Sequence, residues 1–134
     1  MSFGYPKSAR LRRREEFNYV FSRGKKARGK YVKVLYVASP DGETRIGVAV
    51  GKKQAKSWAR NRGRRMLKEA ARRLLPWLKE GYWIVFLLST SGLKKGAREI
   101  YFDMASLCKQ EGLMRIEWPG IDFTPWENKD EKNG

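Results

Sequence analysis

Residues 52–73 read KKQAKSWARNRGRRMLKEAARR and contain ten Lys or Arg but a single acid, Glu69. At about 100° per residue, the small and apolar side chains of this stretch gather in one stripe of a helix, and the basic side chains cover the remainder. The stripe consists of Ala59, Gly63, Met66, Leu67, Ala70 and Leu74. The segment therefore predicts a helix from about Lys56 to Leu75 that packs against a sheet through this stripe, with Gly63 permitting close contact.

The basic face of this helix opposes its own folding. Like charges four residues apart, as in the row Arg60, Arg64, Lys68 and Arg72, each destabilise a helix by a few tenths of a kcal/mol. One interpretation is a solvated face that keeps the protein soluble, although such faces usually mix in acids, and here only Glu69 does so. The other interpretation, which the pattern favours, is a surface that binds phosphates.

Charge is distributed unevenly along the chain. The 134 residues carry a formal net charge of +16, and residues 1–73 hold 22 basic and 5 acidic side chains against 8 and 9 in residues 74–134. A charge this large on a small domain destabilises the compact state by self-repulsion, which indicates a polyanionic partner. The amino-terminal half is therefore the predicted binding half.

Two strands and a short helix are predicted in that half. Residues 11–22 favour a helix whose apolar side chains recur at helical spacing, and the basic stretch at 23–30 resembles a loop. Residues 31–38 are rich in Val and Tyr, and residues 45–50 alternate larger apolar with small side chains, so both predict strands. The turn residues Pro40-Asp41-Gly42 separate them, so a hairpin is expected.

The second half predicts a buried strand and one more helix. Residues 82–88 are continuously apolar, as in a central strand covered on both faces, and residues 95–111 repeat apolar side chains at helical spacing up to Gly112. We expect one domain at residues 1–112 and a carboxyl-terminal extension at 113–134 that is partly disordered.

Catalytic and metal-binding patterns are missing from the sequence. The chain has no histidine, its acids show no metal-binding spacing, and no P-loop or nucleophile elbow occurs. The single cysteine, Cys108, excludes an intramolecular disulfide and reads as a core residue. No apolar run is long enough to span a bilayer and no signal segment is recognisable, so a cytoplasmic protein without a membrane partner is expected. We predict no catalytic residue and no metal ligand on this chain.

The stretch RIGVAVGKK at 45–53, followed by SWARNRGRRMLKEA at 57–70, resembles the signature of the protein component of bacterial ribonuclease P. Its central element is Arg60-Asn61-Arg62, and the resemblance extends over roughly residues 10–112. It implies a two-layer α/β (α+β) sandwich with a mixed sheet of about four strands and three helices. It also implies a left-handed βαβ crossover through the basic helix, against the usual right-handed rule.

The resemblance further implies a protein subunit that assists a ribozyme. In that family the RNA subunit removes the 5′ leader of precursor tRNA with Mg²⁺, which the RNA chiefly binds, and no obligate protein partner is required. The expected partners are therefore the catalytic RNA and precursor tRNA. The implied contacts to the catalytic RNA are Arg60, Asn61, Arg62, Arg64, Arg65, Lys68 and Arg72.

A second set of residues is implied to bind the leader: Phe17, Phe21, Tyr36, Lys52, Lys53 and Ala49. The residues themselves support such a surface, because the small side chains of the 45–51 strand leave a shallow floor on which bases could stack. Ordinary core packing of Phe17 and Phe21 is an equal alternative. Tyr31 and Tyr36 have opposite strand parity, so only one is expected to face the leader, and Tyr36 is preferred.

Other functions remain open. A general or ribosomal RNA-binding protein would carry the same basic helix without a ribozyme partner, because charge alone does not distinguish one folded RNA from another. A DNA-binding protein is less favoured, since no helix-turn-helix, zinc-finger or zipper pattern is present.

Overall fold

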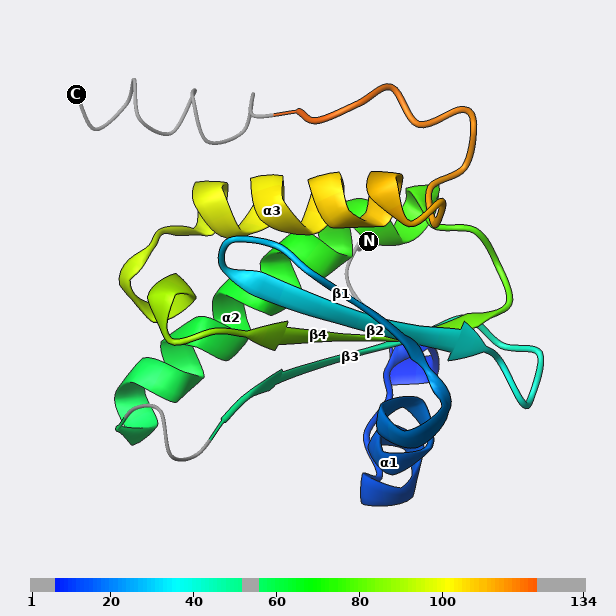
Figure 1. Ribbon diagram of the computed structural model, residues 1–134, viewed down its shortest axis with the longest axis horizontal. Coiled ribbons are helices and arrows are strands. Elements are labelled where there is room, and N and C mark those ends of the chain that lie inside the picture. Colours follow the sequence, from blue (N-terminus) through cyan, green and yellow to red (C-terminus); the bar gives the residue numbers. More distant parts are fainter. Residues whose placement is uncertain (1–6, 52–55, 123–134) are drawn as a thin grey trace.

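The computed structural model describes residues 7–51 and 56–122, which form a two-layer sandwich (Figure 1). The sheet has the strand order β1-β2-β4-β3, with β3 parallel to β4 and the other neighbours antiparallel. Its strands are β1 (Lys25–Arg28), β2 (Val32–Ala38), β3 (Arg45–Val50) and β4 (Tyr82–Leu88), and its helices are α1 (Arg14–Arg23), α2 (Ser57–Leu74) and α3 (Ala97–Gln110). The predicted mixed sheet of four strands with three helices is confirmed. The handedness of the crossover through α2 stays a prediction.

Two predictions about the strands are wrong. β2 and β3 do not form a hairpin, because β4 lies between them and pairs with both. The apolar side chains of β4 on both of its faces explain why this strand takes the central place. The basic stretch predicted as a loop contains β1, an edge strand that pairs along β2. Three of the four side chains of β1 are exposed, so no apolar alternation marked it in the sequence.

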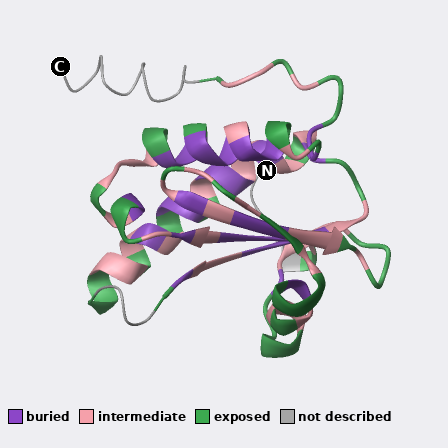
Figure 2. Ribbon diagram, viewed as in Figure 1, coloured by how far each residue is buried: buried purple, intermediate pink, exposed green. Residues whose placement is uncertain are grey.

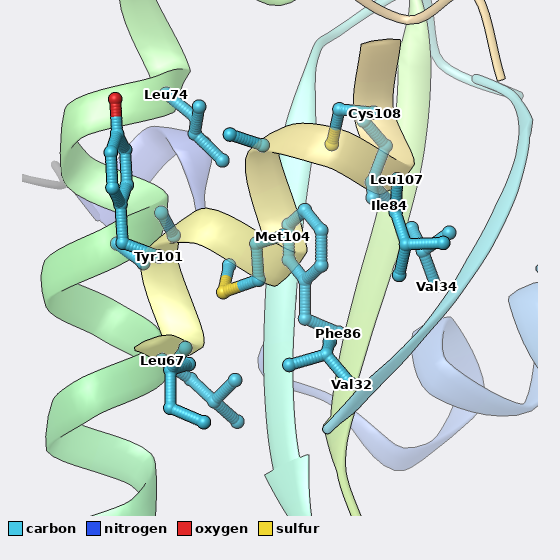
Figure 3. Packing of buried hydrophobic residues seen from close by; sticks show 14 of the residues in the cluster. Val32, Val34, Leu67, Leu74, Ile84, Phe86, Tyr101, Met104, Leu107 and Cys108 are labelled. Atoms are coloured by element: carbon cyan, nitrogen blue, oxygen red, sulfur yellow. The ribbon is translucent and has the colours of Figure 1, made fainter. Parts of the chain in front are cut away.

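The main core lies between the sheet and the pair α2 and α3 (Figure 3). Phe86 of β4, Leu67 of α2 and Met104 of α3 are fully buried there. Cys108 is equally buried, which confirms it as a core residue, and burial raises the pKa of its thiol to about 12. No helix in the described ranges is both long and apolar enough to cross a membrane.

Gly63 lets α2 approach the sheet closely. A Cβ atom at this position would lie 2.9 Å from Leu88 Cδ2 and 3.2 Å from Val50 Cγ2, tighter than ordinary contacts. The predicted reason for a glycine inside this helix is therefore confirmed. The rest of the predicted packing stripe is also buried, except for the half-buried Ala59.

The opposite face of the sheet is covered only in part, by α1 (Figure 1). Val20 of α1 is buried against Leu35 and Val85, and the rings of Tyr19 and Trp83 meet edge to face at 5.7 Å between centroids. Farther along the same face, Lys33, Ala49 and Leu87 remain half-buried. Lys33 and Ala49 are both paired with Leu87, and Leu87 is two residues from Val85 on β4. All three therefore lie on the same face as Val85, because side chains alternate between the two faces along a strand.

The core continues just past the predicted domain boundary. Leu113 and Met114 are buried, and Met114 pairs with Leu78 in an isolated bridge. Beyond them, the backbone N–H of Asp122 donates to the hydroxyl of Tyr101 at 3.2 Å. Residues 113 and 114 therefore belong to the domain, and residues 123–134 of the predicted extension lie outside the described residues.

Candidate nucleic-acid interface

Along α2, exposed and half-buried residues alternate with the buried residues of its packing stripe (Figure 2). Trp58, Asn61, Arg65 and Lys68 are all exposed. Their spacing of three and four residues places them one above the other on the helix surface. Within the described residues, neither Arg65 nor Lys68 has an ion-pair partner. We call these four residues the outer row.

Two further members of the predicted RNA-binding set lie beside this row. The guanidinium of Arg64 donates to the side-chain oxygen of Asn61, and that of Arg60 donates to the Ser57 hydroxyl at 3.4 Å. The structure thus brings Arg60, Asn61, Arg64, Arg65 and Lys68 together within residues 57–68 of α2. Such a surface presents guanidinium and ammonium groups to phosphates.

Arg62 has a different environment. Its guanidinium donates to the backbone carbonyls of Leu93, at 3.1 Å, and Lys95, at 3.0 Å. These hydrogen bonds tie α2 to the segment that leads into α3. Arg62 therefore has a structural role in this fold, and its predicted contact with RNA stays a prediction.

Arg72 lies at the far end of the helix, where the charge is partly neutralised. Glu69 pairs with Arg72 at 2.5 Å and with Arg73 at 3.0 Å. The predicted RNA contact of Arg72 therefore competes with an ion pair and stays a prediction. Among the described residues, the cations of α2 that have no ion-pair partner include Arg65 and Lys68, which lie nearer its amino-terminal end.

The predicted leader-binding residues Phe17, Phe21 and Ala49 lie on the α1 side of the sheet. Phe17 packs on the backbone of β3, because a Cβ atom at Gly47 would lie 2.7 Å from its ring. Phe21 is 37% exposed, and its ring centroid is 6.2 Å from that of Phe17. Phe17 thus serves the core, as the alternative interpretation held, whereas Phe21 offers its ring to solvent.

The placement of Tyr36 beside these aromatics is wrong. Tyr36 lies on the other face of the sheet, where its hydroxyl donates to Glu111 Oε1 at 2.7 Å and its ring meets that of Tyr82. Burial, together with this hydrogen bond to Glu111, raises the pKa of Tyr36 to about 12. Tyr31 also packs against the main core, with Lys95 Nζ 5.5 Å from its ring centroid. Lys52 and Lys53 lie outside the described residues.

A basic hollow was missed in the sequence. A cavity of about 520 Å³ opens at the end of β2 and β4 and is lined by Leu87, by hydroxyl groups of residues 89–91 and by three cations, Arg28, Lys30 and Lys33. Because Lys33 and Leu87 share their face with Ala49, the hollow continues the surface that begins at Phe21. The basic stretch RGKKARGK at 23–30 indicated a cluster of cations, but it has no apolar alternation that would predict a strand there.

The turn between β1 and β2, which carries Lys30 and directly follows Arg28, is held by a carboxylate from α3. Asp103 accepts hydrogen bonds from the backbone N–H groups of Lys30 at 3.1 Å, Tyr31 at 2.8 Å and Val32 at 2.9 Å. Gly29 leaves room for it, because a Cβ atom there would lie 2.5 Å from the carboxylate oxygens. The position of the β1–β2 turn is thus fixed by α3.

Comparison with known proteins agrees with the resemblance of residues 45–70. A family model described as Ribonuclease P matches residues 5–111. A ribonuclease P protein component from Pseudanabaena sp. is 38% identical over 105 residues, which cover 76% of this chain and 90% of the relative. The corresponding protein of Symbiobacterium thermophilum is 32% identical, with 83% and 97% covered.

Solved structures show the same fold. The ribonuclease P protein of Staphylococcus aureus matches with a TM-score of 0.72 and 15% identity, covering 81% of this chain and all of that one. The Thermotoga maritima protein matches with a TM-score of 0.67 and 26% identity, covering 75% and 96%.

Proposed function

The chain belongs to the ribonuclease P protein family, and from this premise we propose that it binds the catalytic RNA and the 5′ leader of precursor tRNA. In this role it assists the Mg²⁺-dependent cleavage that generates the mature tRNA 5′ end. The family relationship makes it a component of an endoribonuclease that processes tRNA. The RNA subunit supplies the reactive groups and holds the Mg²⁺, and the complex works in the cytoplasm, where precursor tRNA is processed.

The observation that carries this proposal is the outer face of α2. Arg65 and Lys68 are exposed, Arg64 is half-buried beside them, and all three lie inside the matched region. Their charges are arranged on a rigid helix, which suits the docking of a folded RNA by its phosphates. The protein contributes charge neutralisation and positioning and leaves the chemistry to its partner.

The α1 side of the sheet suits the leader. The exposed ring of Phe21 offers a stacking surface, and the half-buried Ala49 and Leu87 continue toward the basic hollow. A single strand could stack bases on the aromatic end and place phosphates among Arg28, Lys30 and Lys33 at the other. Because stacking tolerates different bases, this surface accepts leaders of unrelated sequence.

Reconstitution tests the proposed function directly. The purified chain is added to a bacterial ribonuclease P RNA transcript, and cleavage of a precursor tRNA is followed at low Mg²⁺. We expect the protein alone to leave the substrate intact and the mixture to cut it at its 5′ junction at lower Mg²⁺ than the RNA alone requires. Equal rates and equal Mg²⁺ dependence with and without the protein would leave only a general RNA-binding function.

Phe21→Ala is expected to weaken the binding of precursor tRNA to the reconstituted complex by about 5- to 100-fold, as the loss of one stacked base predicts. Binding of mature tRNA, which has no leader, is expected to remain unchanged. Since the Phe21 side chain is 37% exposed and otherwise covered, the midpoint of thermal unfolding should fall, but by less than in Phe17→Ala. Affinities for the two tRNAs measured in parallel provide the check.

Phe17→Ala is the matched control for this prediction. Phe17 fills the space above Gly47, so its removal is expected to lower stability as a core truncation does. If Phe21→Ala loses stability but binds both tRNAs normally, Phe21 has a packing role in the core and does not contact the leader.

A further inference from the structure

Trp58 is exposed on the most basic helix of the protein. Its side chain, in the first turn of α2, has 69% of its surface open to solvent. Three other large apolar residues are exposed in the described part of the chain, namely Phe21, Phe102 and Ile116. Single exposed apolar residues are common and need no explanation on their own. The surroundings of Trp58 set it apart.

The neighbours of Trp58 on the helix surface are polar or positively charged. It stands in the outer row with Asn61 one turn away and Arg65 two turns away, at roughly 5 and 10 Å along the axis. The first turn of α2 contains no acid, and the nearest acid on this helix is Glu69, about 16 Å along the axis. Trp58 is thus a flat apolar surface within a positively charged row.

This combination matches the chemistry of an unpaired nucleobase. A base presents a flat π-surface to the indole, and the phosphates on either side of it meet the cations of the same row. A protein partner would need a larger apolar patch than one ring, and a membrane surface would need an apolar helix face, whereas the apolar face of α2 is buried in the core.

We propose that Trp58 stacks on an unpaired base of the RNA that docks on α2. The inference rests on the proposed function, because it takes the ribonuclease P RNA as the molecule bound by the outer row. The contact of Trp58 requires an unpaired base, whereas Arg65 and Lys68 contact phosphates of paired and unpaired nucleotides alike. The protein thereby recognises a bulge or loop next to the docking site.

Salt dependence distinguishes this contact from the charged ones. Affinity for a bacterial ribonuclease P RNA transcript is measured across a salt series for the full chain, Trp58→Ala and Trp58→Phe. Trp58→Ala is expected to weaken binding by about 5- to 100-fold, and Trp58→Phe by much less, because phenylalanine keeps an aromatic face. The slope of log affinity against log salt should stay the same in both variants, since no charge is removed.

Fluorescence gives an independent readout. Stacking is expected to quench the indole emission of Trp58, so RNA should reduce the emission of the full chain more than that of Trp58→Phe. Ile116→Ala is the matched control, because it removes an apolar side chain that is 95% exposed on a segment that meets the chain just beyond the carboxyl-terminal end of α2, at the opposite end of the helix from Trp58. Its affinity and slope should equal those of the full chain.

The outcomes separate the two proposals. If the full chain does not bind the RNA, the proposed function and this inference fail together. If the full chain binds and Trp58→Ala binds equally well, or weakens binding no more than Ile116→Ala, the stacking contact is overturned and the proposed function stands. A changed salt slope in Trp58→Ala would also overturn it, because the substitution would then have disturbed the charged contacts.

Discussion

Replacing Arg64, Arg65 and Lys68 together with Gln is expected to weaken binding to a bacterial ribonuclease P RNA by about two to three orders of magnitude near 0.1 M salt. Each cation that contacts a phosphate releases counterions on binding and contributes about 0.9 to the slope of log affinity against log salt. The slope should therefore fall by roughly two to three. A salt titration of the full chain and of the triple variant measures both quantities.

Unfolding should not account for this loss. The three side chains lie outside the buried stripe of α2, and removing like charges from one helix face relieves repulsion of a few tenths of a kcal/mol per pair. The unfolding midpoint of the triple variant is therefore expected to equal or slightly exceed that of the full chain. Thermal unfolding followed by circular dichroism checks this.

A charge-matched variant controls for general attraction. Lys26, Lys79 and Lys109 are exposed and lie outside α2, so replacing them with Gln removes the same charge from other parts of the surface. We expect a much smaller loss of affinity in this variant. If both triple variants weaken binding equally, the net charge of the protein is responsible, and α2 is a solvated face with no docking role.

The sequence predicted the elements of the main core because their signals are strong and local. α2 and α3 repeat apolar side chains at helical spacing, and β4 is apolar on both faces. The pairing of the strands depended on distant parts of the chain. A hairpin between β2 and β3 is the simplest local solution, yet β4 inserts between them and supplies both with a partner. No local pattern encodes that insertion.

The candidate site shows the same division. Helical spacing placed Arg65 and Lys68 on the basic face, the family resemblance added Asn61, and all three are exposed on one surface. The preference for Tyr36 assumed that the sheet face could be chosen from strand parity, but parity gives two faces without saying which one α1 covers. The carbonyls that hold Arg62 come from a segment 31 and 33 residues away, which no spacing rule anticipates.

Asp103 is the clearest residue that sequence reasoning passed over. It interrupts the apolar stripe of α3 between Tyr101 and Met104, and an acid at a core position signals a buried polar contact. Its partners are backbone N–H groups at and next to the β1–β2 turn. Because every residue type except proline has such a group, the sequence of the turn does not reveal the contact. The contact connects the main core to the basic hollow, because the same turn carries Lys30 and directly follows Arg28, the last residue of β1.

Asp103→Ala is expected to destabilise the protein by about 3–5 kcal/mol, because it leaves three backbone N–H groups without their acceptor in a mostly buried environment. Thermal unfolding should show a midpoint lower by roughly 10–20 °C. Amide hydrogen exchange at Lys30, Tyr31 and Val32 should lose protection beyond the global change, since these are the donors that the carboxylate holds.

Two variants show whether the hydrogen bonds cause this loss. Glu99→Ala removes an exposed carboxylate from the same helix and should change stability by less than about 1 kcal/mol. Asp103→Asn keeps the size and one acceptor oxygen but turns an NH₂ group toward amide donors, so its loss should lie between those of the other two variants. If Asp103→Ala unfolds within about 3 °C of the full chain and the three amides stay protected, the turn is held by its own backbone pairing, and α3 does not position the basic hollow.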